Sequence, residues 1–265
     1  LVRGLAHVHR LHGRLPLPVV MGPAIHLAKE GFHVSQRFRE QVLEGHEHLN
    51  ADARSIFLTP EGQAPPVGSR IVQLDKARTL EAIARTGGED FYTGDVAQRL
   101  VEAVRAQGGL WTLEDLGGYK PLERPVVEGA YRGHQVLSMG PPSSGGLLLV
   151  QMLGVLEGLQ VPAYGSADFF HVMAEITKRG FAMRARGLGD PDFFQVDHER
   201  FIGEESIRRL RGEIRAATRA TPASAIGQVT VRPDERTETS HFAILTADGD
   251  AVACTQTSNL RFGSG

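Results

Sequence analysis

The sequence contains one cysteine, 6% aromatic residues and nearly balanced charge over its 265 residues. With Cys254 alone, it can form neither an internal disulfide nor a zinc site of several thiolates. Lys and Arg total 29 against 31 Asp and Glu, so nucleic acid and anionic membranes are not expected as the main partner. The longest strongly apolar run, 147–150, is far below the roughly 20 residues that span a bilayer. What is present is a hydrophobic fraction of 41%, enough to bury a core.

The familiar metal and cofactor motifs are incomplete. His46-Glu47-His48-Leu49-Asn50 opens like a zinc-binding helix, but Asn50 stands where the second histidine ligand belongs. Gly187-Leu188-Gly189 lacks the third glycine of a dinucleotide-binding turn, because Asp192 occupies that position. We therefore expect neither a metal nor a cofactor.

Length and patterning indicate one large domain or two small ones, mostly helical before residue 220. Because the chain starts at Leu1 without Met or a signal peptide and ends on 262–265, we expect a piece cut at both ends. Ser35, Asp75 and Asp95 are expected N-caps, and Thr112 to Asp115 resembles a capping box. The predicted helices are 24–31, 35–49, 77–85, 96–105, a long helix after 144, 167–186 and 204–218; the predicted strands are 126–131, 134–138, 240–246 and 251–257; 58–71 reads as a loop and 221–238 as a mobile or extended segment.

The last two strands give the strongest hairpin signal, around Ala247-Asp248-Gly249. A three-residue loop with Gly249 in the left-handed conformation places Thr239 opposite Thr257 on one face, with Asn259 following at spacing two. A two-residue Asp248-Gly249 turn puts the threonines on opposite faces instead. Thr255, Thr257 and Asn259 share one face of the second strand, which indicates either a functional site or the solvent-exposed face of an edge strand.

The order of several motifs along the chain resembles the gamma-glutamyltranspeptidase family of N-terminal-nucleophile hydrolases. These motifs are Thr239-Ser240-His241-Phe242, Asp248-Gly249, Thr255-Gln256-Thr257-Ser258-Asn259 and Phe262-Gly263-Ser264-Gly265, and upstream Pro141-Pro142-Ser143-Ser144-Gly145-Gly146 and Leu188-Gly189-Asp190-Pro191-Asp192-Phe193. The resemblance is collinear over nearly the whole chain, which makes it far more specific than any one short motif.

The resemblance implies an α+β fold, part of a four-layer αββα sandwich, in one incomplete domain. It implies that residues 1–238 belong to a large subunit and 239–265 to a small one, separated by self-cleavage between Glu238 and Thr239. Thr239 then acts as the nucleophile, Thr257 as its hydrogen-bonding partner and Asn259 as a substrate contact. The implied partners are glutathione or another γ-glutamyl donor, and water, an amino acid or a peptide as acceptor. The implied location is periplasmic or extracellular.

This chain departs from the family pattern at several points. Ser240 replaces the commoner threonine, and Gln256 and Ser258 differ from the usual flanks of Thr257. The family's carboxylate-binding arginine is expected before Leu1, and its serine pair and oxyanion-hole glycines beyond Gly265, so the chain alone is expected to be inactive. The alternatives are a cephalosporin-acylase-like or poly-γ-glutamate-depolymerase-like amidase, or a non-enzymatic homologue that is not processed.

Two further side chains on the hairpin receive structural predictions. Cys254 is expected to be buried and to face away from Thr255 and Thr257. His241 is expected on the face of Thr239, with packing in the core as its role.

Overall fold

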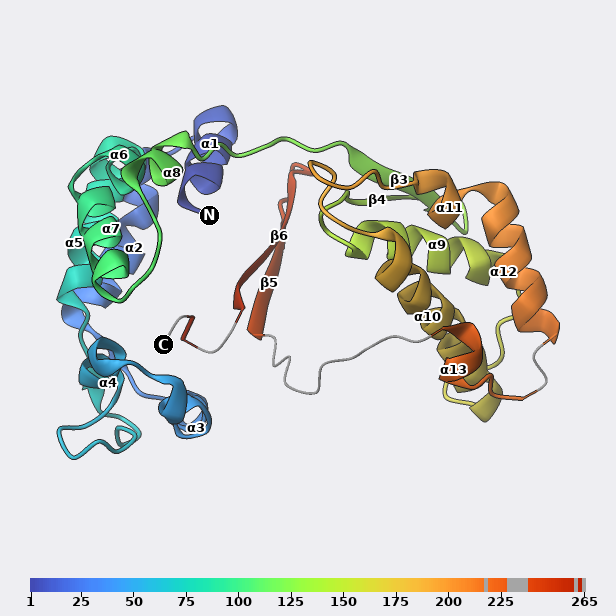
Figure 1. Ribbon diagram of the computed structural model, residues 1–265, viewed down its shortest axis with the longest axis horizontal. Helices are drawn as coiled ribbons and strands as arrows, with labels where there is room; N and C mark the ends of the chain where they lie inside the picture. The colour runs from blue at the N-terminus through green and yellow to red at the C-terminus, as the bar shows by residue number, and fades with distance from the viewer. Residues whose placement is uncertain (217–218, 228–237, 260–261, 264–265) are drawn as a thin grey trace. The chain divides into compact units, whose positions relative to one another are not determined.

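The computed structural model describes residues 1–216, 219–227, 238–259 and 262–263. These residues form two compact units, whose α-helices and longer strands are labelled in Figure 1. Unit 1 joins the described part of 234–265 to 1–121, and unit 2 lies within 122–233. The C-terminal hairpin therefore belongs to the same unit as the first half of the chain. The division into subunits at Glu238–Thr239 stays a prediction.

Unit 1 is built mostly of short helices. Its strands form two separate antiparallel pairs, β1 with β2 and β5 with β6. Over the described part of the chain, no helix is both long and apolar enough to cross a membrane. The elements of unit 1 are α1 (Val2–His12), α2 (Leu17–Glu30), β1 (Phe32–His33), α3 (Gln36–Gly45), the 3-10 turn η1 (His46–His48), α4 (Ala51–Phe57), β2 (Arg70–Ile71), α5 (Leu74–Thr86), α6 (Asp90–Thr93), α7 (Asp95–Ala106), α8 (Leu113–Gly118), β5 (Glu238–Leu245) and β6 (Ala251–Asn259).

Two of the four expected caps of unit 1 are found in the structure. Ser35 Oγ accepts the backbone N–H of Phe38 at 3.1 Å, and Thr112 forms the expected capping box with Asp115. The prediction was wrong for Asp75 and Asp95, which lie inside the first turns of α5 and α7 rather than at their N-caps. A carboxylate in the first turn still favours the helix, because it faces the positive end of the helix dipole.

Unit 2 packs helices against a single hairpin. Strands β3 (Val126–Tyr131) and β4 (His134–Met139) pair across Arg132-Gly133, both with positive φ (49° and 76°), as a two-residue hairpin turn requires. Helix α9 runs along this hairpin (Figure 1), and Gly146 allows its backbone to approach the carbonyl of Met139. The helices of unit 2 are α9 (Gly145–Glu157), α10 (Ala167–Gly187), α11 (His198–Ile202), α12 (Glu204–Ala216) and α13 (Ala223–Ile226).

Two apolar clusters form the core of unit 2. The first contains Val127, Leu147, Val150 and Phe201, and the second contains Val155, Ile176, Leu210 and Ile214. Both include residues of α9, so this helix joins the hairpin to α10 and α12. The periodic apolar residues that follow Ser144 thus serve as the centre of the unit.

A buried carboxylate ties α10 to the segment that leads toward the hairpin of unit 1. The Glu175 side chain is 0% exposed. Lys178 Nζ donates to its Oε1 at 2.5 Å, and Arg179 donates to its Oε2 at 2.5 Å. Thr221 adds its backbone N–H to Oε1 at 2.9 Å and its hydroxyl to Oε2 at 2.6 Å. Four donors therefore fix this carboxylate and hold the chain at Thr221.

We expect this cluster to make the protein sensitive to acid. Burial alone raises the pKa of Glu175, but the hydrogen bonds from Lys178, Thr221 and Arg179 outweigh it and lower the pKa to about 2. A lowered pKa stabilises the fold above the unfolded value of 4.5, and this stability is lost as the pH falls toward 2. The loss is on the order of 3 kcal/mol. Urea unfolding between pH 5 and pH 2 measures it, and a Glu175→Gln variant should lack this part of the pH dependence.

Candidate active site

The hairpin of β5 and β6 adopts the register of the three-residue loop. Thr246 N–H donates to Asp250 O at 2.9 Å, and Gly249 has φ of 89°. From that loop the ladder runs without interruption to Thr239, which lies opposite Thr257. The first of the two registers considered above is confirmed, and the two-residue turn is excluded.

This register places four polar side chains on one face of the hairpin. Thr239 and His241 are two residues apart on β5 and so point to the same face, and Thr257 and Thr255 lie directly opposite them on β6. A hydrogen bond of 2.7 Å joins His241 Nδ1 to Thr255 Oγ1. The prediction that His241 packs in the core was wrong: its side chain is exposed and is held by Thr255.

A β-bulge interrupts the ladder beside the bond between Glu238 and Thr239. Thr239 pairs with Thr257, but Glu238 pairs with Asn259, so Ser258 is an extra residue on β6. Bulges redirect the chain and are frequent next to active sites. The side chains of Glu238 and Asn259 lie outside the described residues, and the expected substrate contact by Asn259 stays a prediction.

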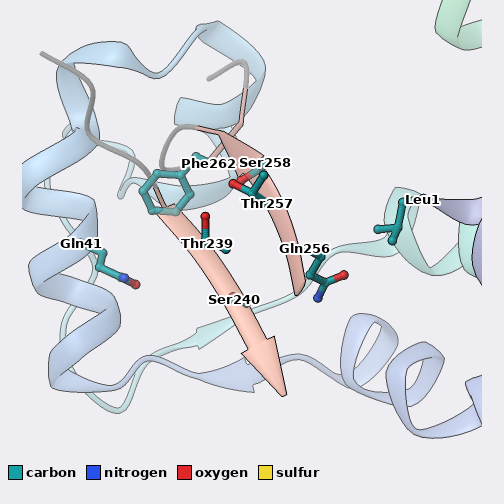
Figure 2. Close-up of a pocket in the computed structure, with 8 residues that line it drawn as sticks. All are labelled: Leu1, Gln41, Thr239, Ser240, Gln256, Thr257, Ser258 and Phe262. Carbon is teal, nitrogen blue, oxygen red and sulfur yellow. The ribbon is translucent and has the colours of Figure 1, made fainter. Parts of the chain in front are cut away.

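A pocket of about 360 Å³ opens at the Thr239 end of the hairpin. Figure 2 shows Thr239 and Thr257 side by side in it, with the Phe262 ring near the Thr239 hydroxyl. Gln41 reaches the same pocket from α3. The described residues that line it are Leu1, Gln41, Thr239, Ser240, Gln256, Thr257, Ser258 and Phe262.

The described side chains that line this pocket carry no charge. They are hydroxyls, carboxamides and apolar groups, and none of them is an imidazole, a carboxylate or an amine. A threonine hydroxyl is a weak nucleophile at neutral pH and needs a base. The described side chains of the lining include no base for the Thr239 hydroxyl.

Comparison with known proteins agrees with the motif order. The family model described as gamma-glutamyltranspeptidase matches residues 1–265. The chain belongs to the gamma-glutamyltranspeptidase family. The resemblance inferred from the motifs is thereby confirmed.

Two curated relatives of this gamma-glutamyltranspeptidase-family chain illustrate the similarity. The glutathione hydrolase proenzyme of Escherichia coli (strain K12) is 38% identical over 263 residues, which cover 96% of this chain and 44% of the relative. The acylase ACY 1 proenzyme of Pseudomonas sp. (strain V22) is 34% identical over 255 residues, covering 95% and 45%. The chain thus spans less than half the length of these curated relatives.

A solved structure extends the similarity to the fold. The crystal structure of the Helicobacter pylori gamma-glutamyltranspeptidase superimposes with a TM-score of 0.81 at 32% identity, covering 88% of this chain and 69% of that chain. Structural neighbours of this kind are N-terminal-nucleophile hydrolases, and the family member described here is likewise a mixture of helices and strands. The α+β class is confirmed; the four layers of the sandwich are not established by this likeness.

Two residues line the pocket that the sequence analysis did not place there. Gln41 has no signal in the sequence, because its proximity to Thr239 arises only from the packing of α3 in unit 1. Phe262 stands in a recognised motif, but nothing in the motif indicates that its ring lines the pocket. Thr239 and Thr257 are brought together as expected.

Cys254 and the histidines around η1 have no part in this site. Cys254 is half-buried rather than buried, since a two-stranded hairpin leaves both its faces partly open. It alternates with Thr255 along β6 and so faces away from the threonines, as expected. Among the residues that the structure describes, no group of three or more His, Cys, Asp or Glu side chains could hold a metal ion.

Proposed function

We propose that the protein is a γ-glutamyl hydrolase and transferase in which Thr239 is the nucleophile. The observation that carries the proposal is the register that sets Thr239 opposite Thr257, with both residues lining one pocket. The names of its relatives support the substrate class, because a glutathione hydrolase proenzyme is 38% identical to this chain. The donor is glutathione or another γ-glutamyl amide, and no cofactor takes part.

The first reaction is cleavage of the chain itself. The hydroxyl of Thr239 attacks the carbonyl carbon of Glu238, and the peptide C–N bond breaks as the acyl group moves from nitrogen to oxygen. Water then hydrolyses the ester, leaving a carboxylate on Glu238 and a free α-amine on Thr239. Residues 1–238 become the large-subunit portion and 239–265 the start of the small subunit. The proenzyme names of the relatives support this step.

The second reaction uses the new amine as the base. With an unperturbed pKa near 8, an α-amine can take the proton from the hydroxyl as Thr239 attacks the γ-carbonyl of the donor. The donor's amide C–N bond breaks, the leaving amine receives the proton, and the γ-glutamyl group remains on Thr239 as an ester. Water releases it as glutamate, or the amine of an amino acid or peptide takes it to form a new amide.

The neighbours of Thr239 would support both reactions. Thr257 lies directly opposite Thr239, and in the proposed reactions its hydroxyl would hydrogen-bond the amine or hydroxyl of the nucleophile. Asn259 contacts the α-amino end of the donor. The hairpin would take its place in one of the two central sheets of an αββα sandwich, and the protein would act in the periplasm or outside the cell.

A related amidase activity is the second candidate. The acylase ACY 1 proenzyme is 34% identical to this chain, the same identity as one of the glutathione hydrolase relatives. The same nucleophile and processing would then act on a different acyl group. A full-length sequence with an arginine for the donor carboxylate favours the γ-glutamyl substrate; its absence favours the acylase.

The function is tested by trapping the acyl-enzyme. The full-length protein is mixed with a γ-glutamyl anilide, quenched in acid and analysed by peptide mass spectrometry. We expect one γ-glutamyl group on the peptide that begins with Thr239, together with release of the aniline. An unmodified peptide with no aniline released contradicts the γ-glutamyl activity, while labelling by an acylase substrate alone supports the second candidate.

The hydroxyl of Thr257 is expected to matter for both reactions. Thr257→Val keeps the shape of the side chain but removes its hydrogen bond, and we expect about a hundredfold loss in the rates of processing and of donor turnover. The matched control is Thr255→Val, on the same strand and face but paired with His241. Time courses on denaturing gels and kcat/KM for the donor give both rates. Equal losses in the two variants would show that Thr257 has no special role.

A further inference from the structure

Four phenylalanine rings meet beside the pocket of Thr239. The ring of Phe262 lies 5.0 Å from that of Phe57 and 6.2 Å from that of Phe38, measured between centroids. Phe38 in turn contacts Phe32 at 5.4 Å in an edge-to-face arrangement. Distances and angles of this kind are those at which aromatic pairs attract one another beyond the area they bury. We call Phe32, Phe38, Phe57 and Phe262 the phenylalanine cluster.

The members of the cluster come from opposite sides of the proposed cut. Phe32 lies on β1, Phe38 on α3 and Phe57 on α4, all before Glu238. Phe262 follows β6, the strand that carries Thr257. When the peptide bond before Thr239 is broken, contacts such as these hold the two portions together without a covalent link.

The backbone at Phe262 shows that the ring is held in place. Phe262 has φ of 61°, in the left-handed region that residues with a Cβ seldom occupy, and Gly263 follows with φ of 68°. A side chain that keeps its backbone in this region needs compensating contacts. Here the contacts are those with Phe38 and Phe57, and the same ring forms a wall of the pocket that holds Thr239 and Thr257.

We propose that Phe262 is the anchor by which the segment that begins at Thr239 stays seated on the preceding part of the chain, and that it thereby positions Thr239 and Thr257. The proposal rests on the processing described above, because only processing makes this contact one between two subunits. The contact itself exists in the uncut chain, so it can be measured whether or not processing occurs.

Hydrogen exchange in the uncut protein tests the anchor. In the full-length protein with Thr239→Ala, which blocks processing, we expect Phe262→Leu to speed amide exchange in β5 and β6 by about tenfold, because the aromatic contacts are lost. Phe262→Tyr keeps the ring and should restore slow exchange. Phe193→Leu is the control, since the Phe193 side chain belongs to unit 2 and is 91% exposed. Unchanged exchange in Phe262→Leu overturns the proposal.

A glycine variant separates the ring from the backbone. Phe262→Gly removes the ring and also the energetic cost of the left-handed conformation, which glycine adopts readily. If the ring is the anchor, exchange in β5 and β6 is faster than in the parent despite the relaxed backbone. If it is not, exchange is unchanged or slower, and the proposal fails.

The positioning role predicts a specific kinetic result in the protein with Thr239 intact. We expect Phe262→Leu to lower kcat for the donor about tenfold, with a smaller change in KM and with rescue by Phe262→Tyr. If the wild-type protein stays uncut while the Phe262→Leu variant loses slow exchange, the processing is contradicted and the anchor stands. A processed wild type with no effect of Phe262→Leu on exchange contradicts the anchor alone.

Discussion

Thr239→Ala is expected to leave the full-length protein as a single uncut chain without measurable turnover of a γ-glutamyl donor. The change removes the hydroxyl that attacks the Glu238 carbonyl, and with it the later nucleophile. Because the α-amine that serves as base is created only by the cut, both functions are lost together. Loss of at least about a thousandfold in turnover is expected, as for other enzymes that lose a nucleophile. Denaturing gels and donor assays on the purified protein measure the two effects.

Thr239→Ser is the matched variant, because it keeps a hydroxyl at the same place on β5. It should still process and turn over, more slowly than the parent. Ser240→Ala is the neighbouring control. Ser240 also lines the pocket, but as the next residue along β5 it lies on the opposite face of the strand from Thr239. If Thr239→Ala cuts normally, or if Ser240→Ala abolishes cutting in its place, the assignment of the nucleophile is wrong.

Glu175→Gln is expected to produce the largest loss of stability among the variants considered. The substitution removes the buried carboxylate partner of Arg179, whose side chain is 9% exposed and keeps only the more exposed Glu213, and it weakens the bonds from Lys178 and Thr221. Breaking a buried ion pair by removing one partner typically costs about 3–5 kcal/mol. Urea unfolding of the full-length protein at pH 7, followed by circular dichroism, measures the loss.

Two further variants make the interpretation of this result specific. Glu213→Gln removes a carboxylate that contacts the same Arg179 at 3.1 Å but is itself 42% exposed, so about 1 kcal/mol or less is expected. Glu175→Leu combined with Arg179→Leu removes both buried charges and should recover part of the loss. Equal effects of Glu175→Gln and Glu213→Gln would contradict the burial argument.

The sequence predicted those structural features that depend on residues close to one another along the chain. The sequence located the hairpin turn at Ala247-Asp248-Gly249 and limited the hairpin to two registers, of which the structure adopts the one with the three-residue loop. Strand alternation then places Thr239 and Thr257 on one face. Ser35 and Thr112 cap their helices for equally local reasons.

What the sequence did not predict depends on packing between distant segments. Glu175 and Thr221 are brought together by the fold of unit 2, and no sequence pattern indicates that they are in contact. Gln41 and Phe262 reach Thr239 for the same reason in unit 1. The bulge at Ser258 is a single extra residue in a strand, which alternation alone cannot reveal.

Burial was the least predictable property of the hairpin. Cys254 lies among small apolar residues, which suggested a covered sheet, and His241 was expected to pack in such a core. In the structure the His241 side chain is exposed and that of Cys254 is half-buried, so neither lies in a covered core.

The position of the new chain end tests the central claim most directly. The purified full-length protein is separated under denaturing conditions, and the smaller chain is analysed by intact mass and by N-terminal sequencing. We predict a second chain that begins with Thr239-Ser240-His241 and a larger one that ends at Glu238. A single uncut chain, or a new N-terminus at any other residue, would contradict the account.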